Sequence, residues 1–117
     1  DYIHSKGLLF GIYSACGYLT CRDLPGSLGH EEIDAQTFAN WTIDYLKYDA
    51  CHNETIPLEK RTIPMRDALN KTGRPIFYSL SDGGFSLPWL WGKPVANSWR
   101  ITMDVKTDGM LLYILLM

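Results

Sequence analysis

The stretch HEEIDAQTFANWTIDYLKYD (His30–Asp49) decides the fold class, because its pattern changes within a few residues. Its first part, His30–Trp41, has apolar residues at helical spacing, and the acidic pair Glu31 and Glu32 suits the positively polarised start of a helix. Its second part, Ile43–Asp49, is short and rich in Ile, Leu and Tyr, which indicates a strand. The sequence therefore predicts a helix followed directly by a strand.

The same alternation of helix and strand patterns extends on both sides of this stretch. One further helix is predicted at Leu58–Thr72, with Pro64 in its first turn and Gly73 as its C-cap. Three further strands are predicted, at Leu8–Ser14, Pro75–Ser81 and Asn97–Asp104. Strands that alternate with helices of about 10 to 15 residues form right-handed βαβ units with parallel strands. We therefore expect an α/β fold with a parallel sheet.

Two of the predicted connections have unusual compositions. The segment Gly17–Gly29 is long for a strand-to-helix connection, and we expect it to cover a site. The segment Asp82–Pro94 contains adjacent glycines, two prolines and two tryptophans. This composition favours an irregular loop with a short helix over a regular helical crossover.

Charge and hydropathy exclude two kinds of partner. Eleven basic and thirteen acidic residues give a net charge of −2, which provides no electrostatic footprint for a nucleic acid backbone. The longest apolar run, Met110–Met117, is far shorter than the roughly 20 residues that span a bilayer. The amino terminus also has no signal-peptide pattern. We therefore expect no nucleic acid partner and no membrane span.

The cysteine pattern leaves two interpretations open. Cys16, Cys21 and Cys51 form no C-x-x-C pair, so a zinc site that also uses His52 is less favoured than one disulfide and one free thiol. A secretory route is favoured by three glycosylation sequons, which start at Asn40, Asn53 and Asn70. We therefore expect a protein of the secretory pathway, located outside the cell, in the cell wall, or in a vacuole or lysosome.

Polar side chains gather where the predicted strands end. Lys47 and Asp49 are two residues apart, so on a strand they point to the same face, which is the inner face if the sheet closes into a barrel. Arg100 and Asp104 are four residues apart, so on a strand they also share a face and can pair. The carboxyl ends of parallel strands form one surface where ligands and catalytic groups collect. Ordinary ion pairs at strand ends explain the pattern equally well.

Five motifs in order resemble those of the melibiase-type α-galactosidases, which are clan D glycoside hydrolases. The segment FANWTIDYLKYDAC (Phe38–Cys51) resembles the segment that carries the family's nucleophile. The other motifs are GIYSACGYLTC (Gly11–Cys21), PGSLGHEEIDAQTF (Pro25–Phe38), MRDALNKTGRPIFYSL (Met65–Leu80) and NSWRITMD (Asn97–Asp104). The similarity extends from about Tyr2 to Val105. The number of ordered motifs makes a chance resemblance negligible.

The resemblance implies a (β/α)8 TIM barrel and a retaining hydrolysis of terminal α-D-galactosyl residues, without a cofactor or a metal ion. Asp49 matches the nucleophile and Asp104 matches the acid/base, which are the two carboxylates that this reaction needs. The implied substrates are galactosides, galacto-oligosaccharides or glycoconjugates. Lys47 and Arg100 match residues that bind sugar hydroxyls, and Tyr13 matches an aromatic residue that lines the pocket. Cys21 and Cys51 match a disulfide that lies beside the nucleophile.

Some positions depart from the family pattern. Ser81-Asp82-Gly83 stands where plant-type members have Cys-Glu-Trp, so Ser81 and Asp82 are the expected substrate contacts, and Gly83 removes an indole near the second carbon of the sugar. Which substituent the site accepts on the second carbon of the sugar therefore stays open. Ala15 stands where the family commonly has Asp, and Cys16, where Ala is usual, is then the unpaired thiol.

The length of the chain bears on its activity. A complete barrel needs about 250 residues, whereas the recognised motifs supply approximately strands three to six. Residues 1–108 are therefore expected to form a partial catalytic domain, and residues 109–117 a divergent apolar tail. The partner that completes such a barrel could be a missing half or a second copy in a homodimer. A family hydrolase is the leading interpretation, and a non-catalytic remnant or galactoside-binding chain is the alternative.

Overall fold

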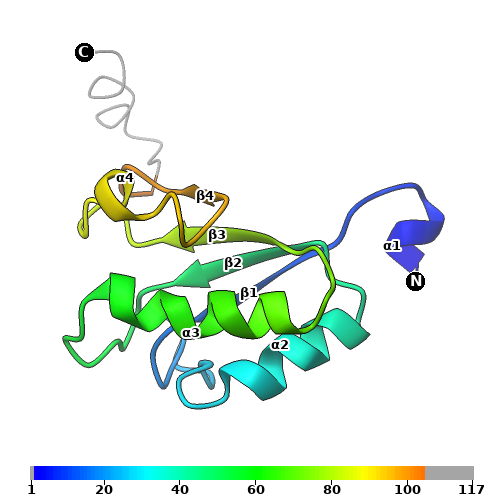
Figure 1. The fold of residues 1–117 in the computed structure, drawn as a ribbon, viewed down its shortest axis with the longest axis horizontal. Helices are drawn as coiled ribbons and strands as arrows, with labels where there is room; N and C mark the ends of the chain where they lie inside the picture. The colour runs from blue at the N-terminus through cyan, green and yellow to red at the C-terminus, as the bar shows by residue number, and fades with distance from the viewer. Residues whose placement is uncertain (1, 105–117) are drawn as a thin grey trace, which may run out of the picture.

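The computed structural model describes residues 2–104, so the predicted boundary at residue 108 and the tail 109–117 lie outside the described residues. The described part alternates helices and strands along the chain (Figure 1). The helices are α1 (Tyr2–Ser5), α2 (Glu31–Asn40), α3 (Leu58–Lys71) and α4 (Pro88–Trp91). The strands are β1 (Gly11–Ala15), β2 (Tyr45–Asp49), β3 (Phe77–Ser81) and β4 (Ser98–Trp99). None of these helices is long and apolar enough to cross a membrane.

The four strands form one parallel sheet in the order β1-β2-β3-β4, which confirms the predicted α/β class. Lys47 of β2 lies between Tyr13 of β1 and Ser79 of β3 in the register. Asp49 likewise lies between Ala15 and Ser81. Because the strands run in the same direction, their carboxyl ends meet at one edge of the sheet.

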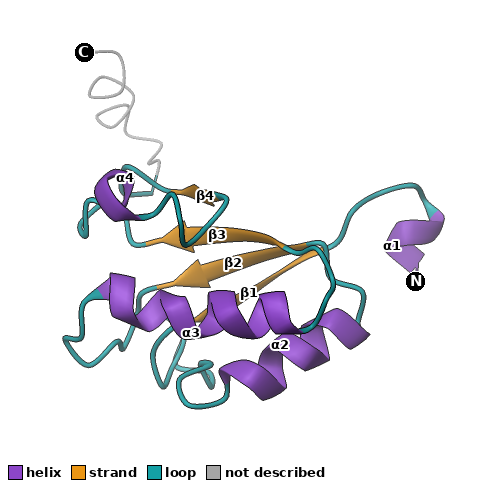
Figure 2. Cartoon of the chain, in the orientation of Figure 1, coloured by secondary structure: helices purple, strands orange, loops and turns teal. Residues whose placement is uncertain are grey.

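One face of the sheet packs against α2 and α3, as Figure 2 shows. Leu46 and Tyr48 of β2 point to this face and are 0% and 1% exposed. They belong to a core that includes Leu80 of β3, Ala35 of α2 and Met65 of α3. Burial of each large apolar side chain contributes about 1.5 to 3 kcal/mol. The core therefore fixes which side of β2 faces the helices.

The opposite face of the sheet is more open to solvent. Tyr13, Tyr45 and Phe77 point to it and are 41%, 37% and 47% exposed. Tyr45 and Phe77 lie opposite each other in the register, and their rings stack with centroids 5.7 Å apart. Lys47 and Asp49 share this face, because they alternate with the buried residues of β2. The prediction that they point the same way is therefore confirmed.

The first strand begins later than predicted, at Gly11 instead of Leu8. The residue before it, Phe10, donates its N–H to the Asp44 carboxylate at 2.8 Å and accepts from the Asp44 N–H at 2.8 Å. One of these two bonds uses a side chain instead of a backbone partner. The regular ladder therefore starts one residue later.

The fourth strand is much shorter than predicted, because only Ser98–Trp99 pair with β3. Arg100 still donates its backbone N–H to the Leu80 carbonyl at 3.0 Å. The chain then packs against the loop after β3, where a Cβ on Gly84 would lie 2.6 Å from the Ile101 oxygen. This close packing takes residues 101–104 out of the sheet.

The predicted position of Pro64 in the first turn of its helix is wrong. Helix α3 begins at Leu58, because Pro57 has a non-helical ψ of 133° and its carbonyl accepts from the N–H groups of Lys60 and Arg61. Pro64 therefore lies inside the helix, where it provides no N–H for the Lys60 carbonyl. The C-cap is Thr72 instead of the predicted Gly73, which directly follows it with φ +74°.

Candidate active site

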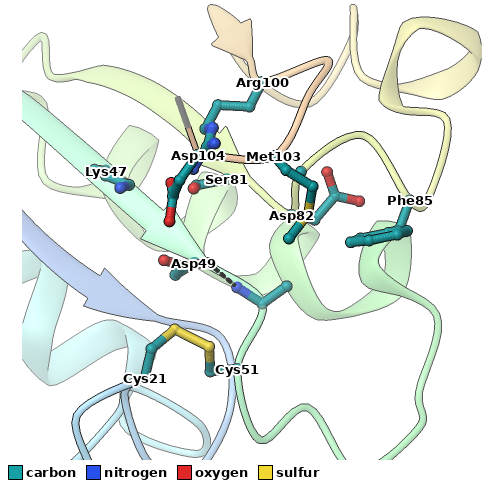
Figure 3. Close-up of a pocket in the computed structure, with 12 residues that line it drawn as sticks. Cys21, Lys47, Asp49, Cys51, Ser81, Asp82, Phe85, Arg100, Met103 and Asp104 are labelled. Carbon is teal, nitrogen blue, oxygen red and sulfur yellow. Dashed lines mark hydrogen bonds and ion pairs between the residues drawn. A yellow bond between two sulfur atoms is a disulfide. The ribbon is translucent and has the colours of Figure 1, made fainter. Parts of the chain in front are cut away.

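A pocket of about 410 Å³ lies at the carboxyl ends of β2, β3 and β4 (Figure 3). Its lining includes all the site residues predicted from the sequence except Tyr13: Cys21, Lys47, Asp49, Cys51, Ser81, Asp82, Arg100 and Asp104. Ala50, Gly83, Phe85 and Met103 complete it. The pocket therefore joins side chains from three strand ends and from the loop after β1.

Asp49 is held at the end of β2 by two hydrogen bonds. Its Oδ1 accepts from the Ala50 N–H at 2.9 Å, and its Oδ2 accepts from the Tyr13 hydroxyl at 3.2 Å. Tyr13 thus reaches the site through Asp49, although it does not line the pocket itself. Burial raises the pKa of Tyr13, and the neighbouring Asp49 carboxylate adds to the increase. The phenol therefore stays protonated and remains a hydrogen-bond donor at neutral pH.

Arg100 and Asp104 form the ion pair that the sequence predicted. Arg100 donates from Nη1 to Asp104 Oδ1 at 2.7 Å and from Nη2 to the Thr102 carbonyl at 3.0 Å. The pair does not arise from strand alternation, because both residues follow the end of β4. The Asp104 side chain is 83% exposed, so it faces the open side of the pocket.

Lys47 supplies a second cation on the same face as Asp49. Its Nζ lies 5.7 Å from the centroid of the Tyr13 ring, which is within the range of a cation–π interaction. Figure 3 shows its amino group on the side of the pocket opposite Phe85. The pocket therefore combines two cations with the carboxylates of Asp49 and Asp104.

Ser81 and Asp82 both line the pocket, but their polar atoms have different surroundings. Ser81 is the last residue of β3 and is 3% exposed. The Asp82 carboxylate accepts from the N–H groups of Gly84 at 2.9 Å and Ser86 at 2.7 Å. Both of its oxygens are therefore engaged by the loop that Asp82 itself begins.

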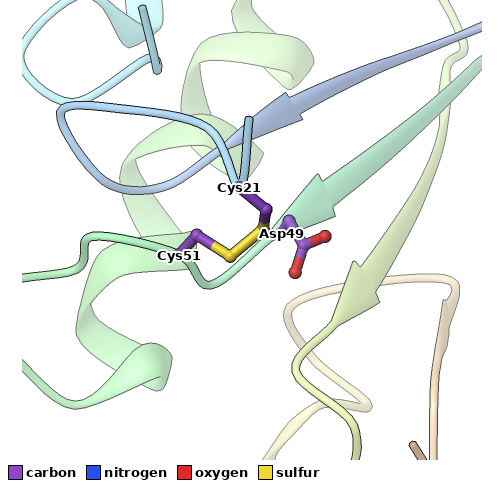
Figure 4. A group of neighbouring side chains, drawn as sticks. All are labelled: Cys21, Asp49 and Cys51. Carbon is purple, nitrogen blue, oxygen red and sulfur yellow. A yellow bond between two sulfur atoms is a disulfide. The ribbon is translucent and has the colours of Figure 1, made fainter. Parts of the chain in front are cut away.

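The expected disulfide joins Cys21 to Cys51, with their Cα atoms 5.2 Å apart (Figure 4). It fastens the loop after β1 to the residues that follow Asp49. The cysteine sulfurs and an Asp49 oxygen lie within 4.8 Å of one another. The disulfide leaves neither sulfur as a thiolate, which is the form that binds a metal ion. The zinc interpretation is therefore not supported by this cluster.

Cys16 is the free cysteine among the described residues, as the resemblance implied. Its side chain belongs to the core and is 0% exposed. Burial raises the pKa of the Cys16 thiol to about 12. Cys16 is therefore an inert, neutral core residue at physiological pH.

Sequence reasoning missed the apolar part of the pocket, which includes Phe85 and Met103. Phe85 is 78% exposed and Met103 is 50% exposed. One signal could have identified Phe85, because a phenylalanine directly after two glycines in a loop has little core around it. Met103 directly precedes Asp104, the residue that matches the acid/base of the family.

The four parallel strands alternate with helices and carry a carboxylate-lined pocket at their carboxyl ends, which defines an α/β fold with a candidate ligand site. The family described as Melibiase_2, alpha galactosidase A, matches residues 1–107, and the chain belongs to this family.

Relatives from several organisms are similar over most of the chain. Alpha-galactosidase 3 of Arabidopsis thaliana is 59% identical over 105 residues, which are 90% of this chain and 24% of the relative. The alpha-galactosidase of Cyamopsis tetragonoloba is 53% identical over 109 residues, which are 92% of this chain and 26% of the relative. The chain therefore spans about a quarter of the length of the curated relatives it matches.

Solved structures of alpha-galactosidases are similar to the same region. The structure of the Saccharomyces cerevisiae enzyme with raffinose is 51% identical and has a TM-score of 0.86, over 90% of this chain and 24% of that chain. The structure of alpha-galactosidase I from Mortierella vinacea is 50% identical and has a TM-score of 0.84, over 88% of this chain and 27% of that chain. The four parallel strands and their helices therefore match part of the alpha-galactosidase fold.

Proposed function

We propose that this chain is approximately strands three to six of a (β/α)8 barrel, and that it carries both catalytic carboxylates of a retaining α-galactosidase. The observation that carries the proposal is that Asp49 and Asp104 line one pocket at the carboxyl ends of the strands. Active sites of such barrels occupy this end.

In the proposed reaction, Asp49 attacks the anomeric carbon of a terminal α-galactosyl residue. A bond forms between its carboxylate oxygen and that carbon, while the bond to the leaving oxygen breaks and Asp104 gives that oxygen a proton. Asp104 then takes a proton from water, and the water oxygen replaces Asp49 on the anomeric carbon. Galactose is released with its original configuration, because two inversions cancel.

The neighbouring side chains have supporting roles in this proposal. The Tyr13 hydroxyl and the Ala50 N–H each donate to a different oxygen of Asp49, which orients the carboxylate. Lys47 and Arg100 line the pocket as cations that can donate hydrogen bonds to sugar hydroxyls. Ser81 adds a hydroxyl to the lining, and the disulfide of Cys21 and Cys51 forms a wall beside Asp49.

The proposed substrates are α-galactosides: galacto-oligosaccharides or glycoconjugates that end in α-D-galactose. The relative from Saccharomyces cerevisiae was solved with raffinose, a trisaccharide of this class. A secretory compartment is proposed as well, because structural disulfides form in oxidising compartments and the Cys21–Cys51 disulfide accompanies three sequons. The rest of the barrel would come from a missing half or from a second copy of the chain.

A hybrid enzyme tests the proposed function. Residues 2–104 replace the aligned segment of the Saccharomyces cerevisiae α-galactosidase, which supplies the rest of the barrel. We expect the hybrid enzyme to hydrolyse raffinose, and Asp49→Asn to abolish the turnover. A hybrid enzyme that folds but does not release galactose would show that this segment lacks a competent catalytic pair.

The alternative function is a non-catalytic galactoside-binding chain or remnant. One observation favours it, because the Asp104 side chain is 83% exposed, whereas a catalytic acid is commonly enclosed in an apolar site. Binding of galactose by the 117-residue chain, together with an inactive hybrid enzyme, would support this alternative. Turnover by the hybrid enzyme would exclude it as an account of these residues.

A further inference from the structure

The pocket has an apolar wall that the proposed reaction does not use. Phe85 and Met103 form it, and they are 78% and 50% exposed. In Figure 3 the Phe85 ring lies on the side of the pocket away from Lys47. Exposed apolar side chains at the rim of a polar pocket are typical of a ligand-binding surface.

The loop that presents Phe85 is held by hydrogen bonds on both sides of the ring. Asp82 accepts from the N–H groups of Gly84 and Ser86, which flank Phe85 in sequence. The indole N–H of Trp91 donates to the Ser86 carbonyl at 2.8 Å. Asp82 is therefore a positioning residue for Phe85. Such bonds restrict the loop and reduce the entropy that is lost when a ligand binds.

Gly83 makes the wall continuous. It has φ +69°, and a Cβ at this position would lie 2.9 Å from Met103 Sδ and 3.3 Å from the Phe85 ring. Both side chains therefore close over the glycine, and a larger residue there would separate them. The two apolar groups form one surface.

We infer that Phe85 and Met103 bind the sugar ring that carries the leaving oxygen. The inference rests on the proposed function, because it takes Asp104 as the proton donor to that oxygen. Met103 is the chain neighbour of Asp104, so a ring attached to the oxygen beside Asp104 lies within reach of the wall. A pyranose has an apolar face of C–H groups, and the negatively polarised face of an aromatic ring attracts these hydrogens. The wall therefore discriminates among leaving groups, and the galactosyl ring occupies the polar side.

Ligand-detected saturation transfer NMR on the hybrid enzyme, carrying Asp49→Asn so that raffinose is not hydrolysed, tests this assignment ring by ring. The probes are galactose and raffinose, in which the leaving oxygen belongs to a glucosyl ring. The variants are Phe85→Ala and Met103→Ala, with Phe85→Trp as the conservative replacement. Leu90→Ala is the matched control, because Leu90 is 74% exposed but does not line the pocket.

We expect saturation of both the galactosyl and the glucosyl protons of raffinose with the Asp49→Asn hybrid enzyme that carries no further change. Phe85→Ala should lower the glucosyl signal at least threefold relative to the galactosyl signal, and Met103→Ala should lower it less. Phe85→Trp and Leu90→Ala should leave the ratio of the two signals unchanged. Galactose, which has no leaving-group ring, should bind equally to all variants.

Four outcomes would overturn the inference. In the first, raffinose binds and Phe85→Ala leaves the ratio of the two signals unchanged. This result contradicts the role of the wall in binding the leaving-group ring but is compatible with the proposed function. In the second, galactose binds and raffinose gives no signal, which also contradicts only the role of the wall. In the third, neither sugar binds, which contradicts the proposed function as well. A change in self-association by Phe85→Ala without a change in the ratio would assign the surface to a protein contact instead.

Discussion

The Arg100 guanidinium donates to the Asp104 carboxylate at 2.7 Å, at the end of a segment that has already left the sheet. The Asp104 side chain is 83% exposed, and an exposed pair of this kind contributes only about 0 to 1 kcal/mol. The pair therefore orients the Asp104 carboxylate towards the pocket but restrains it only weakly. Catalytic contacts that are loose in a free enzyme commonly tighten when the substrate binds.

We expect the loss caused by Asp104→Asn to depend on the leaving group. In the hybrid enzyme, the variant removes the proton that raffinose needs, so kcat/KM for raffinose should fall by about 100-fold to 10,000-fold. A dinitrophenyl galactoside leaves without protonation and should lose far less in its first step. Steady-state and burst kinetics with both substrates measure the difference.

Asp67→Asn is the matched control for this prediction. Asp67 also pairs with an arginine, Arg66, at 2.7 Å, but it lies on α3 and does not line the pocket. This control should keep the activity of the hybrid enzyme on both substrates. Equal losses on both substrates in Asp104→Asn would contradict the role of Asp104 as acid.

The disulfide of Cys21 and Cys51 should contribute strongly to stability. It joins residues separated by 30 positions, and closing a loop of this length is worth about 3 to 4 kcal/mol in the chain-entropy account. A Cys21→Ser, Cys51→Ser double variant of the hybrid enzyme should therefore have a lower urea midpoint. Reducing agent should lower the midpoint of the unchanged protein and leave that of the variant unaffected. A midpoint that is equal in both proteins without reductant would contradict this prediction.

Asp44 should make stability depend on pH in the acid range. The Phe10 N–H, His4 and Arg74 bind its carboxylate at 2.8, 2.6 and 2.7 Å, and these contacts hold its pKa below the usual value, with the backbone N–H of Phe10 as the largest cause. A lowered pKa stabilises the folded state above the unfolded pKa of about 3.9, and this stabilisation is lost as the pH falls through the folded pKa.

The test for Asp44 compares urea midpoints of Asp44→Asn and the unchanged hybrid enzyme between pH 7 and pH 2. The difference should be constant from pH 7 to about pH 5 and should shrink as the pH falls below about 4. A difference that grows towards low pH would have the wrong sign for a carboxylate stabilised in its ionised form.

The isolated 117-residue chain should self-associate. Among the described residues, β1 and β4 each pair with only one neighbouring strand, and unpaired strand edges promote association. The stacked rings of Tyr45 and Phe77 also stay 37% and 47% exposed. Size-exclusion chromatography with light scattering should give a mass above the 13.3 kDa of one chain.

A lysine introduced on the open face of the sheet distinguishes association through this face from non-specific aggregation. Phe77→Lys should reduce the self-association, whereas Ile33→Lys, at a 68% exposed position on α2, should not. A monodisperse monomer that unfolds cooperatively would contradict the prediction that the chain needs a partner for its open face.

Alternation along the strands made part of the site predictable. Lys47 and Asp49 were placed on one face because side chains alternate along a strand, and the buried residues between them, Leu46 and Tyr48, fix that face. The disulfide followed from the resemblance and not from cysteine spacing, since three cysteines allow more than one pairing. Strand parity therefore placed Lys47 and Asp49 on one face, and the resemblance gave the correct disulfide, whereas Arg100 and Asp104 pair beyond the end of β4.

Long-range packing decided the features that the sequence analysis missed. The fourth strand ends early because the chain after Arg100 packs against the loop at Gly84, a contact that no local pattern reveals. Asp82 was predicted to contact the substrate, and that role stays a prediction. The N–H groups of Gly84 and Ser86 nevertheless occupy both of its oxygens. Phe85 was missed because an exposed aromatic in a glycine-rich loop resembles an ordinary loop residue.

Trapping of the glycosyl-enzyme identifies the residue that acts as the nucleophile, which we propose is Asp49. The hybrid enzyme is incubated with a slow-turnover fluorinated galactosyl fluoride, digested, and mapped by peptide mass spectrometry. We predict one added fluorogalactosyl group on the peptide that contains Asp49, and no label in Asp49→Asn. A label on Asp82 or Asp104 instead, or turnover without any covalent label and with inverted configuration of the released galactose, would show that Asp49 is not the nucleophile.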